Sequence, residues 1–232
     1  MNRSTWVHLE AYSIGHAMNK TQVLERIFKK KLVPVVRTRS TDEARAAIGV
    51  LSDCGISVFE ITMTVPNACD LIAELRDSLP NVLLGAGTVL DRSTAKQCVE
   101  AGAQFIVSPA FDAETVKYCR EADVAVMPGA LTPTEVLSAW KAGADCVKVF
   151  PCDALGGPKY LRTLKTLFPQ IEMMPTGGVS LETIGDFFLA GACAVGVGTD
   201  LVDFDAIRRG DYETVAAKAR NYLACLPADR ND

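Results

Sequence analysis

Short apolar runs alternate with helical patterns from residue 32 to residue 197, and this alternation restricts the chain to a small group of folds. The runs are rich in valine and isoleucine and are apolar almost throughout, which is typical of strands buried on both faces of a parallel sheet. Eight such runs predict strands at residues 32–37, 58–62, 82–86, 104–108, 124–127, 145–149, 171–174 and 192–197. The pattern therefore favours an α/β fold with a parallel sheet.

The segments between these runs carry signals for the start and the end of helices. Residues that favour the N-cap predict helix starts at Thr41, Asp91, Asp112, Thr132 and Ser180. Glycine predicts helix ends at Gly55, Gly102, Gly143 and Gly191. An amphipathic stretch from Val23 to Phe28 adds a short helix before the first strand. Eight strand and helix units indicate a single (β/α)8 TIM barrel with a short N-terminal helix, with an open doubly wound sheet as the alternative.

The composition indicates a soluble globular chain with one domain. The 232 residues are 49% hydrophobic and carry a net charge of −4, with no apolar stretch that could span a membrane and no basic stripe for nucleic acid. The eight cysteines form no Cys-x-x-Cys pair and mostly lie in apolar segments, so we expect reduced thiols in a cytoplasmic protein. Residues 1–17 lack a secretory signal and are expected to be an N-terminal extension before a barrel domain at 18–232.

Lys148 lies in the middle of the apolar run 145–151, where a buried strand is expected. Burying an unpaired ammonium is costly, so such a lysine is paired with a carboxylate, extends to water from an edge strand, or is held as a neutral amine. A neutral lysine amine attacks carbonyl carbon atoms. Lys148 is therefore a candidate nucleophile, with the first two possibilities open beside it.

Glu60 is a second charged residue inside an apolar strand, in Val58-Phe59-Glu60-Ile61. In a barrel it points into the same interior as Lys148, where it forms a structural ion pair or moves protons for the lysine. Both histidines, His8 and His16, precede the predicted barrel, which excludes histidine-dependent hydrolysis and a histidine-rich zinc site there. We therefore expect amine chemistry with no metal and no cofactor.

Other unusual residues lie at the predicted carboxyl ends of strands, where barrel enzymes carry their sites. They are Arg37, Thr62, Gly87, Thr88, Ser108, Pro109 and Phe150. Glycines in Thr176-Gly177-Gly178 and Gly196-Val197-Gly198-Thr199 follow the last two strands, where backbone N–H groups can converge on a phosphate. Each residue alone could be a turn glycine, a helix cap or a surface charge. Together they predict a small-molecule site with an anion subsite.

The same residues carry a resemblance to a known family over about residues 18–205. The matching segments are Gly55 to Thr62, Gly85 to Leu90, Val107 to Pro109, Gly143 to Pro151 and Pro175 to Gly178. In these segments the chain resembles the class I 2-keto-3-deoxy-6-phosphogluconate / 2-keto-4-hydroxyglutarate (KDPG/KHG) aldolases. The resemblance implies a lyase that releases pyruvate and an aldehyde from a 2-keto-3-deoxy-6-phospho sugar acid or from 4-hydroxy-2-oxoglutarate. It also implies a homotrimer, for which apolar residues late in the chain, among them Leu201, Val202 and Phe204, are candidate subunit contacts.

The resemblance assigns a role to each candidate residue. It makes Lys148 the Schiff-base lysine and Glu60 the general acid/base. It places Thr88, Pro109 and Phe150 at the pyruvate end, and Thr176, Gly177, Gly178 and Thr199 at the phosphate. Cys152 replaces a small residue and Thr199 a serine.

The chain departs from the family in how it could bind the substrate carboxylate. Many members carry an arginine two residues after the Glu-x-Thr motif, where this chain has Thr64. Other members carry an arginine at the end of the first strand, and Arg37 fits that position. Since a guanidinium matches a carboxylate in shape and charge, we expect Arg37 to bind it.

Two other functions remain open from the sequence. A phosphate-binding barrel isomerase or synthase would use Lys148 only to neutralise charge, and a non-catalytic barrel would bind a sugar phosphate without turnover. Trapping with pyruvate and borohydride distinguishes them from an aldolase, because only a Schiff base leaves a stable adduct.

Overall fold

The computed structural model describes residues 18–228, and the predicted extension at 1–17 lies outside this range. The described chain opens with helix α1 (Lys20–Lys30), as the sequence predicts. Asn19 and Gln22 form a capping box at its start, in which each side chain accepts a hydrogen bond of 3.0 Å from the backbone N–H of the other residue. Val23 and Ile27, which lie on one face of α1, are buried against the strands.

All eight predicted strands are present, and every pairing between strands is parallel. The strands are β1 (Leu32–Val36), β2 (Val58–Thr62), β3 (Leu83–Gly87), β4 (Phe105–Val107), β5 (Ala125–Met127), β7 (Val147–Val149), β8 (Met173–Pro175) and β9 (Val195–Val197). A further short strand, β6 (Gly129–Ala130), follows β5 after Pro128 and is not predicted by the sequence. Proline has no N–H group for a strand ladder, which explains the break between β5 and β6.

The strands form two sheets. The six-stranded sheet has the order β5-β4-β3-β2-β1-β9, and the three-stranded sheet has the order β6-β7-β8. An isolated parallel bridge between Thr176 and Gly196 joins the end of β8 to β9. The parallel sheet therefore forms at least a half-barrel, with the second sheet beside it.

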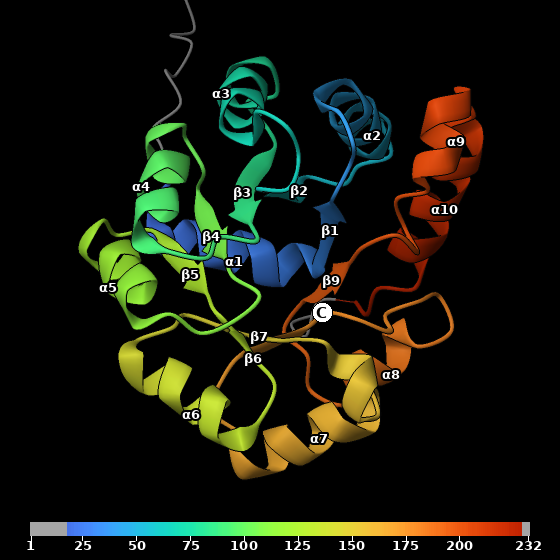
Figure 1. Ribbon diagram of the computed structural model, residues 1–232. Coiled ribbons are helices and arrows are strands. Elements are labelled where there is room, and N and C mark those ends of the chain that lie inside the picture. The colour runs from blue at the N-terminus through green and yellow to red at the C-terminus, as the bar shows by residue number, and fades with distance from the viewer. Residues whose placement is uncertain (1–17, 229–232) are drawn as a thin grey trace, which may run out of the picture.

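The helices lie around the outer side of the strands (Figure 1). They are α2 (Thr41–Asp53), α3 (Ala68–Ser78), α4 (Arg92–Glu100), α5 (Ala113–Glu121), α6 (Pro133–Ala142), α7 (Pro158–Leu167), α8 (Ile184–Leu189), α9 (Phe204–Arg209) and α10 (Tyr212–Ala224), with a 3₁₀ turn η1 (Cys152–Leu155) after β7. This arrangement differs from an open doubly wound sheet, which has helices on both faces. It is the α/β architecture of TIM-like barrels.

Three of the predicted helix starts are confirmed by their hydrogen bonds. The side chains of Asp91, Asp112 and Thr132 accept the N–H of the residue three positions later, at 2.8, 2.8 and 3.3 Å. A helix also begins at Thr41, with Ser40 as its N-cap.

The predicted helix start at Ser180 is wrong, because α8 begins only at Ile184. The hydroxyl of Thr183 accepts the N–H of Ser180 at 2.9 Å and donates to the carbonyl of Gly178 at 2.7 Å. These side-chain bonds hold residues 180–183 in a turn, as Ser and Thr hydroxyls do when they compete with a helix.

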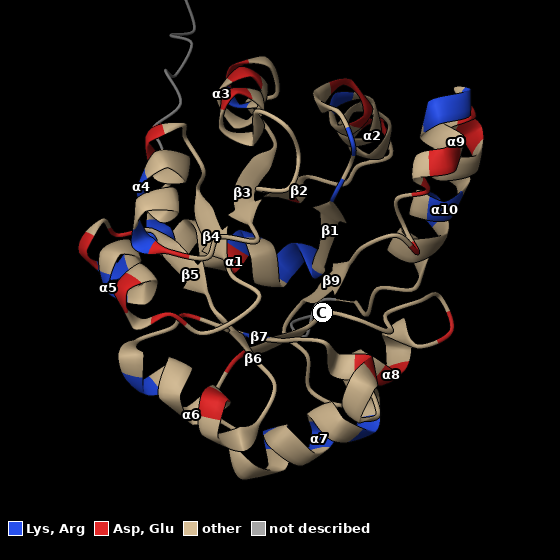
Figure 2. Ribbon diagram, in the orientation of Figure 1, with Lys and Arg blue, Asp and Glu red and all other residues tan. Residues whose placement is uncertain are grey.

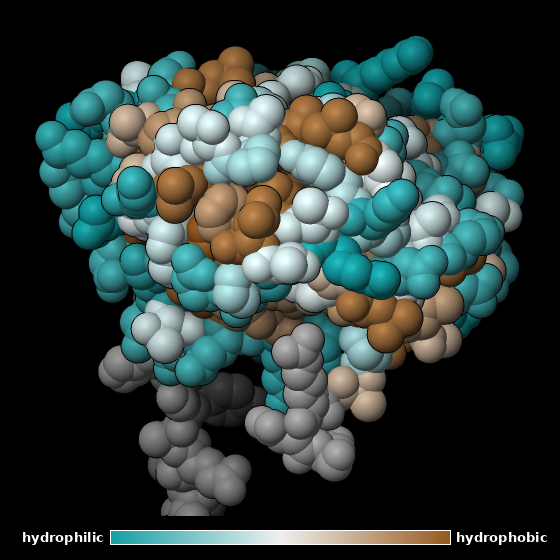
Figure 3. Space-filling model, turned by 90° about the horizontal axis from the view of Figure 1, so that it is seen from below, coloured by the Kyte–Doolittle hydropathy of each residue, from teal (hydrophilic) through white to brown (hydrophobic). Residues whose placement is uncertain are grey.

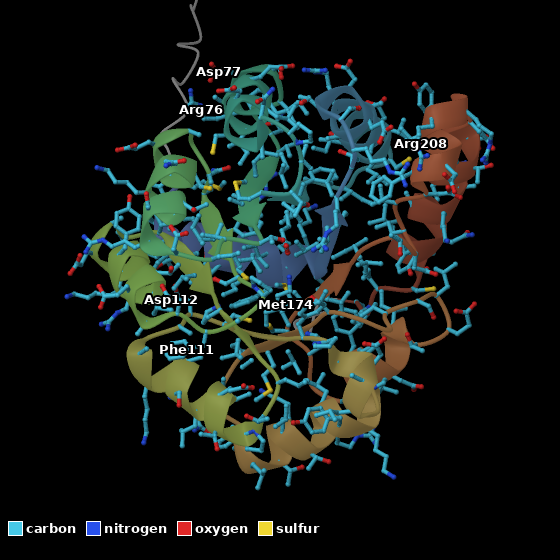
Figure 4. All side chains as sticks on the ribbon, in the orientation of Figure 1. Arg76, Asp77, Phe111, Asp112, Met174 and Arg208 are labelled. Atoms are coloured by element: carbon cyan, nitrogen blue, oxygen red, sulfur yellow. The ribbon has the colours of Figure 1, made fainter. Side chains whose placement is uncertain are left out.

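The apolar core has two parts, on opposite faces of the sheets. The outer part, which includes Phe59, Leu71 and Ile106, fills the space between strands and helices. The inner part combines α1 with side chains on the inner face of the strands or directly before them, namely Val33, Val58, Leu83, Phe105, Val107, Ala125, Met127, Cys146, Met174 and Ala194. Figure 1 shows α1 crossing behind the strands, and Figure 4 shows Met174 near the centre of the ring of strands. Since α1 covers the end where the strands begin, the inner face is left for a site at their carboxyl ends.

Charged residues of both signs are mixed on the surrounding helices (Figure 2). One ion pair links α9 to α2, where Nε of Arg208 lies 3.7 Å from Oε1 of Glu43 (Figure 4). No helix within residues 18–228 is long and apolar enough to cross a membrane.

The expectation that Leu201 and Val202 form subunit contacts is wrong, because both are 0% exposed in the core of the single chain.

Candidate active site

Lys148 and Glu60 meet on the inner face of the sheets. Lys148 is the middle residue of β7, and its neighbours Val147 and Val149 point to the outer core. Glu60 is the middle residue of β2 and shares the inner face with Val58, because side chains alternate along a strand. The Lys148 Nζ lies 3.3 Å from Oε1 and 3.5 Å from Oε2 of Glu60, with the two side chains 6% and 0% exposed. The two charged groups of the apolar strands are therefore one buried pair.

The glycine at position 87 leaves the space that the Glu60 carboxylate occupies. Gly87 lies beside Thr62 in the β2–β3 pairing, and a Cβ atom at Gly87 would lie 2.1 Å from Oε1 of Glu60. Glu60 is completely buried. The sequence suggests only a turn at Gly87, and its role beside Glu60 is visible only once β2 and β3 are paired.

Phe150 lies near this pair, and Pro109 lies beside β6, the strand that pairs with β7. The ring centroid of Phe150 lies 5.4 Å from the Lys148 Nζ, within the range of a cation–π contact. Pro109 follows β4 and packs closely against β6, since a Cβ atom at Gly129 would lie 2.2 Å from the Pro109 carbonyl. A site with few water contacts strengthens the interaction between charged groups inside it.

Arg37 and Thr88 meet at the carboxyl ends of β1 and β3. Nη2 of Arg37 donates a hydrogen bond of 3.4 Å to the hydroxyl of Thr88, and the Arg37 side chain is exposed. Thr88 has a φ of 56°, in the left-handed region that a β-branched residue rarely adopts. Such strain is concentrated at functional sites. This pair therefore places a guanidinium and a hydroxyl at the edge of the inner face.

Two hydroxyl groups lie at the end of β2 and just after it, and the second, Thr64, stands where the resemblance leads one to expect an arginine. The hydroxyl of Thr62 donates to the carbonyl of Val36 at 3.2 Å and lies 2.7 Å from the hydroxyl of Thr64. These neutral groups cannot replace the charge of a guanidinium. Arg37 is thus the cation that the structure places beside the ends of β1 and β3.

The glycine turn after β8 presents backbone donors without protein acceptors. Gly177 and Gly178 have φ values of 95° and 72°, which glycine adopts at no steric cost. Within residues 18–228 their N–H groups make no hydrogen bond, and the buried hydroxyl of Thr176 has no partner. Consecutive N–H groups in such a turn form a concave site that suits an anion.

Cys152 lies next to this turn, and backbone contacts hold it there. Its N–H donates to the carbonyl of Thr176 at 2.9 Å, and its Sγ lies 3.5 Å from the carbonyl of Gly157. Burial and the nearby Asp153 raise the pKa of the Cys152 thiol to about 12, so it is protonated and unreactive at neutral pH. The sequence departure at Cys152 therefore leaves the turn intact.

Contacts join the predicted site residues in three groups. One group is Lys148, Glu60 and Phe150, the second is Arg37 and Thr88, and the third is the turn from Thr176 to Gly178. In the described part of the chain, no hydrogen bond or ion pair links Pro109 or the exposed Thr199 to these groups. Also within residues 18–228, no three His, Cys, Asp or Glu side chains gather as they would around a metal ion.

The chain matches known proteins over most of its length. The family model "KDPG and KHG aldolase" covers residues 23–218. The 2-dehydro-3-deoxy-phosphogluconate aldolase of Treponema pallidum is 32% identical over 87% of this chain and 96% of its own. The 2-dehydro-3-deoxy-6-phosphogalactonate aldolase of Escherichia coli K12 is 34% identical over 75% of this chain and 85% of its own.

A solved structure of an aldolase shows the same architecture. The KDPG aldolase of Legionella pneumophila has a TM-score of 0.79 and 27% identity, covering 85% of this chain and 96% of that one. It was captured with pyruvate at low pH as a covalent carbinolamine intermediate. The resemblance found in the sequence is confirmed by the family match and by these relatives, which are aldolases and so lyases. The chain belongs to the KDPG and KHG aldolase family.

Proposed function

We propose that this chain is a class I aldolase that cleaves 2-keto-3-deoxy-6-phosphogluconate, its galactonate analogue or 4-hydroxy-2-oxoglutarate. The products are pyruvate and an aldehyde, such as glyceraldehyde 3-phosphate. The observation that carries the proposal is the position of Lys148. This residue is only 5% exposed, and its Nζ lies 3.3 Å from Oε1 of Glu60. An amine buried beside a carboxylate has both a nucleophile and a group that moves protons. The test is pyruvate release from each of the three substrates.

The proposed reaction begins when the Lys148 amine attacks the C2 ketone and forms a carbinolamine. Loss of water gives a protonated imine, which draws electrons from C3. Removal of the proton from the C4 hydroxyl then breaks the C3–C4 bond, and the aldehyde leaves. The enamine that remains takes a proton at C3, and water releases pyruvate from the lysine. Each step moves a proton, and Glu60 is the carboxylate within reach of the Lys148 Nζ.

The substrate has two anionic ends, and we propose one receptor for each. Arg37, held beside Thr88, binds the carboxylate. The N–H groups of Gly177 and Gly178, with the hydroxyls of Thr176 and Thr199, bind the phosphate. Thr88, Pro109 and Phe150 then surround the pyruvate half next to Lys148.

This division predicts different losses for two variants. Arg37→Ala is expected to lower kcat/KM about ten- to a hundredfold on every substrate, because all of them share the carboxylate. Thr199→Val is expected to lower kcat/KM on phosphorylated substrates only. Rates of pyruvate release from KDPG and from 4-hydroxy-2-oxoglutarate measure both effects.

Matched controls for this prediction are Arg39→Ala, two residues from Arg37, and Thr166→Val on the outer helix α7. Both residues are exposed, and neither control should change the ratio between the two substrates. Equal losses on both substrates for Thr199→Val would contradict the phosphate site. Full activity of Arg37→Ala would contradict the carboxylate site.

We also propose that the two sheets form one closed (β/α)8 barrel within a single domain at residues 18–232. The bridge between Thr176 and Gly196 supports closure between β8 and β9. On the other side, the N–H groups of Asp145 and Lys148 donate to the carbonyls of Val126 and Pro128, at 3.1 and 3.0 Å. These bonds support the view that β5 and β6 are two halves of one strand.

For assembly and location, we propose a cytoplasmic homotrimer, as the resemblance implies. Exposed apolar side chains such as Leu167 and Leu189, 57% and 78% exposed, are available for contacts, and Figure 3 shows separate apolar patches between polar regions on one face. Light scattering at micromolar concentration is expected to give three times the chain mass of 24.9 kDa. A monomer or a dimer would contradict this prediction.

A further inference from the structure

A buried tyrosine of the last helix contacts both loops of the proposed phosphate site. Tyr222 lies on α10 and is 0% exposed. Its hydroxyl donates to Oδ2 of Asp200 and lies 3.4 Å from the carbonyl oxygen of Val179. Asp200 directly follows Thr199, and Val179 directly follows Gly178. One hydroxyl therefore bridges the loops after β8 and β9.

Other contacts hold each of these two loops separately. Thr183 binds the carbonyl of Gly178 at 2.7 Å, within the first loop. The N–H groups of Leu201 and Val202 donate to the carbonyl of Gly198 at 3.1 and 3.0 Å, within the second loop. Beyond the bridge between Thr176 and Gly196, the Tyr222 hydroxyl is a point where the two loops share a partner.

Asp200 brings a negative charge next to a site proposed for an anion. Its Oδ2 is hydrogen-bonded to Tyr222 and lies 3.8 Å from Nζ of Lys218, and both of these residues belong to α10. The carboxylate is therefore held on the side of α10. Burial, followed by the bond to Asp200, raises the pKa of Tyr222, so its hydroxyl remains a donor at physiological pH.

We propose that Tyr222 is a positioning residue for the phosphate end of the substrate. It fixes the distance between the Gly177-Gly178 turn and Thr199, and it keeps the Asp200 carboxylate away from the bound anion. This inference rests on the proposed function, because it assigns a support to the phosphate site of that proposal. It extends the site to α10, which contributes no group that touches the substrate.

The test is Tyr222→Phe, which removes one oxygen atom and keeps the buried ring. We expect KM for KDPG to rise about tenfold, since a hydrogen bond to a charged group is lost, while kcat stays within twofold. Inorganic phosphate, as a competitive inhibitor, should bind more weakly by a similar factor. Both constants for the unphosphorylated 4-hydroxy-2-oxoglutarate should be unchanged. The matched control is Tyr212→Phe at the start of the same helix, where the side chain is 46% exposed.

A double variant separates the two parts of this role. If the freed charge of Asp200 causes the loss, Tyr222→Phe with Asp200→Asn should recover most of the affinity for KDPG and for inorganic phosphate. Losses of equal size on both substrates, or an unchanged KM for KDPG, would overturn the inference. Failure of the phosphate site itself gives a different result: inorganic phosphate would not compete even with the unaltered protein, and Thr199→Val would not distinguish the substrates.

Discussion

Replacing Lys148 with arginine is expected to abolish pyruvate release, because a guanidinium keeps the positive charge but is never deprotonated to attack a ketone. The charge partner of Glu60 is retained, so the fold should survive. Lys148→Ala should also be inactive, but it leaves the Glu60 carboxylate buried at 0% exposure without its partner. Removing one member of a buried pair commonly costs about 3–5 kcal/mol of unfolding free energy. The arginine variant is therefore the cleaner test of chemistry.

The direct measurement is a covalent trap. Borohydride added with pyruvate should reduce the imine, and mass spectrometry should locate the adduct on the peptide that contains Lys148. Lys20→Arg is a matched control, since Lys20 forms an ion pair of 2.9 Å with Asp145, two residues before β7. That control should retain activity and trapping. An adduct on another lysine would contradict the assignment, and the absence of any adduct would favour the isomerase or the non-catalytic barrel.

The sequence could predict the buried pair because each member breaks an apolar pattern. Lys148 and Glu60 are 88 residues apart, yet each is the charged residue in the middle of its strand. The inner side chains of neighbouring parallel strands lie in one shared interior. Two charged groups on that face must therefore pair with each other or be stabilised by other groups. The eight strand positions followed from the same contrast between apolar runs and helical patterns.

Features that depend on pairing between distant segments were not predictable in the same way. The space that Gly87 leaves for Glu60 depends on the register of β2 against β3. The sequence prediction ends its strand at residue 127, because no apolar pattern marks the two residues of β6 that follow Pro128. The turn at Ser180 has a favourable cap residue, but Thr183 uses its hydroxyl for the loop instead. The space at Gly87 therefore depends on contacts between distant segments, whereas the turn at Ser180 results from local side-chain bonds that compete with the helix.

The proposed role of Tyr222 was also not predictable from the sequence. Its residue type and helical spacing indicate only a core side chain, and its partners Asp200 and Val179 lie 22 and 43 residues away. The sequence motif marked the glycines and Thr199 of the proposed phosphate site. It did not mark the helix that holds their loops, because no charge or glycine interrupts the pattern at Tyr222.

Glu60→Gln is expected to lower kcat by about 10²–10⁴-fold, the usual contribution of general acid/base catalysis. Glutamine keeps the size of the side chain and fits the space beside Gly87, but its amide cannot accept and return a proton. KM should change little, because the proposed ligands of the substrate are Arg37 and the glycine turn. Formation of the pyruvate adduct should be slowed as well, since carbinolamine formation and loss of water both need proton transfer.

The measurement for Glu60 combines steady-state cleavage with the rate of borohydride trapping. Glu74→Gln is a matched control, because Glu74 pairs with Arg45 at 2.7 Å on the outer helices, away from the inner face. It should leave both rates unchanged. If Glu60→Gln keeps kcat within a few-fold of the unaltered protein, Glu60 serves only as the ion-pair partner of Lys148. Proton transfer would then have to come from water or from the hydroxyls nearby, and the pair at 3.3 Å would be a structural one.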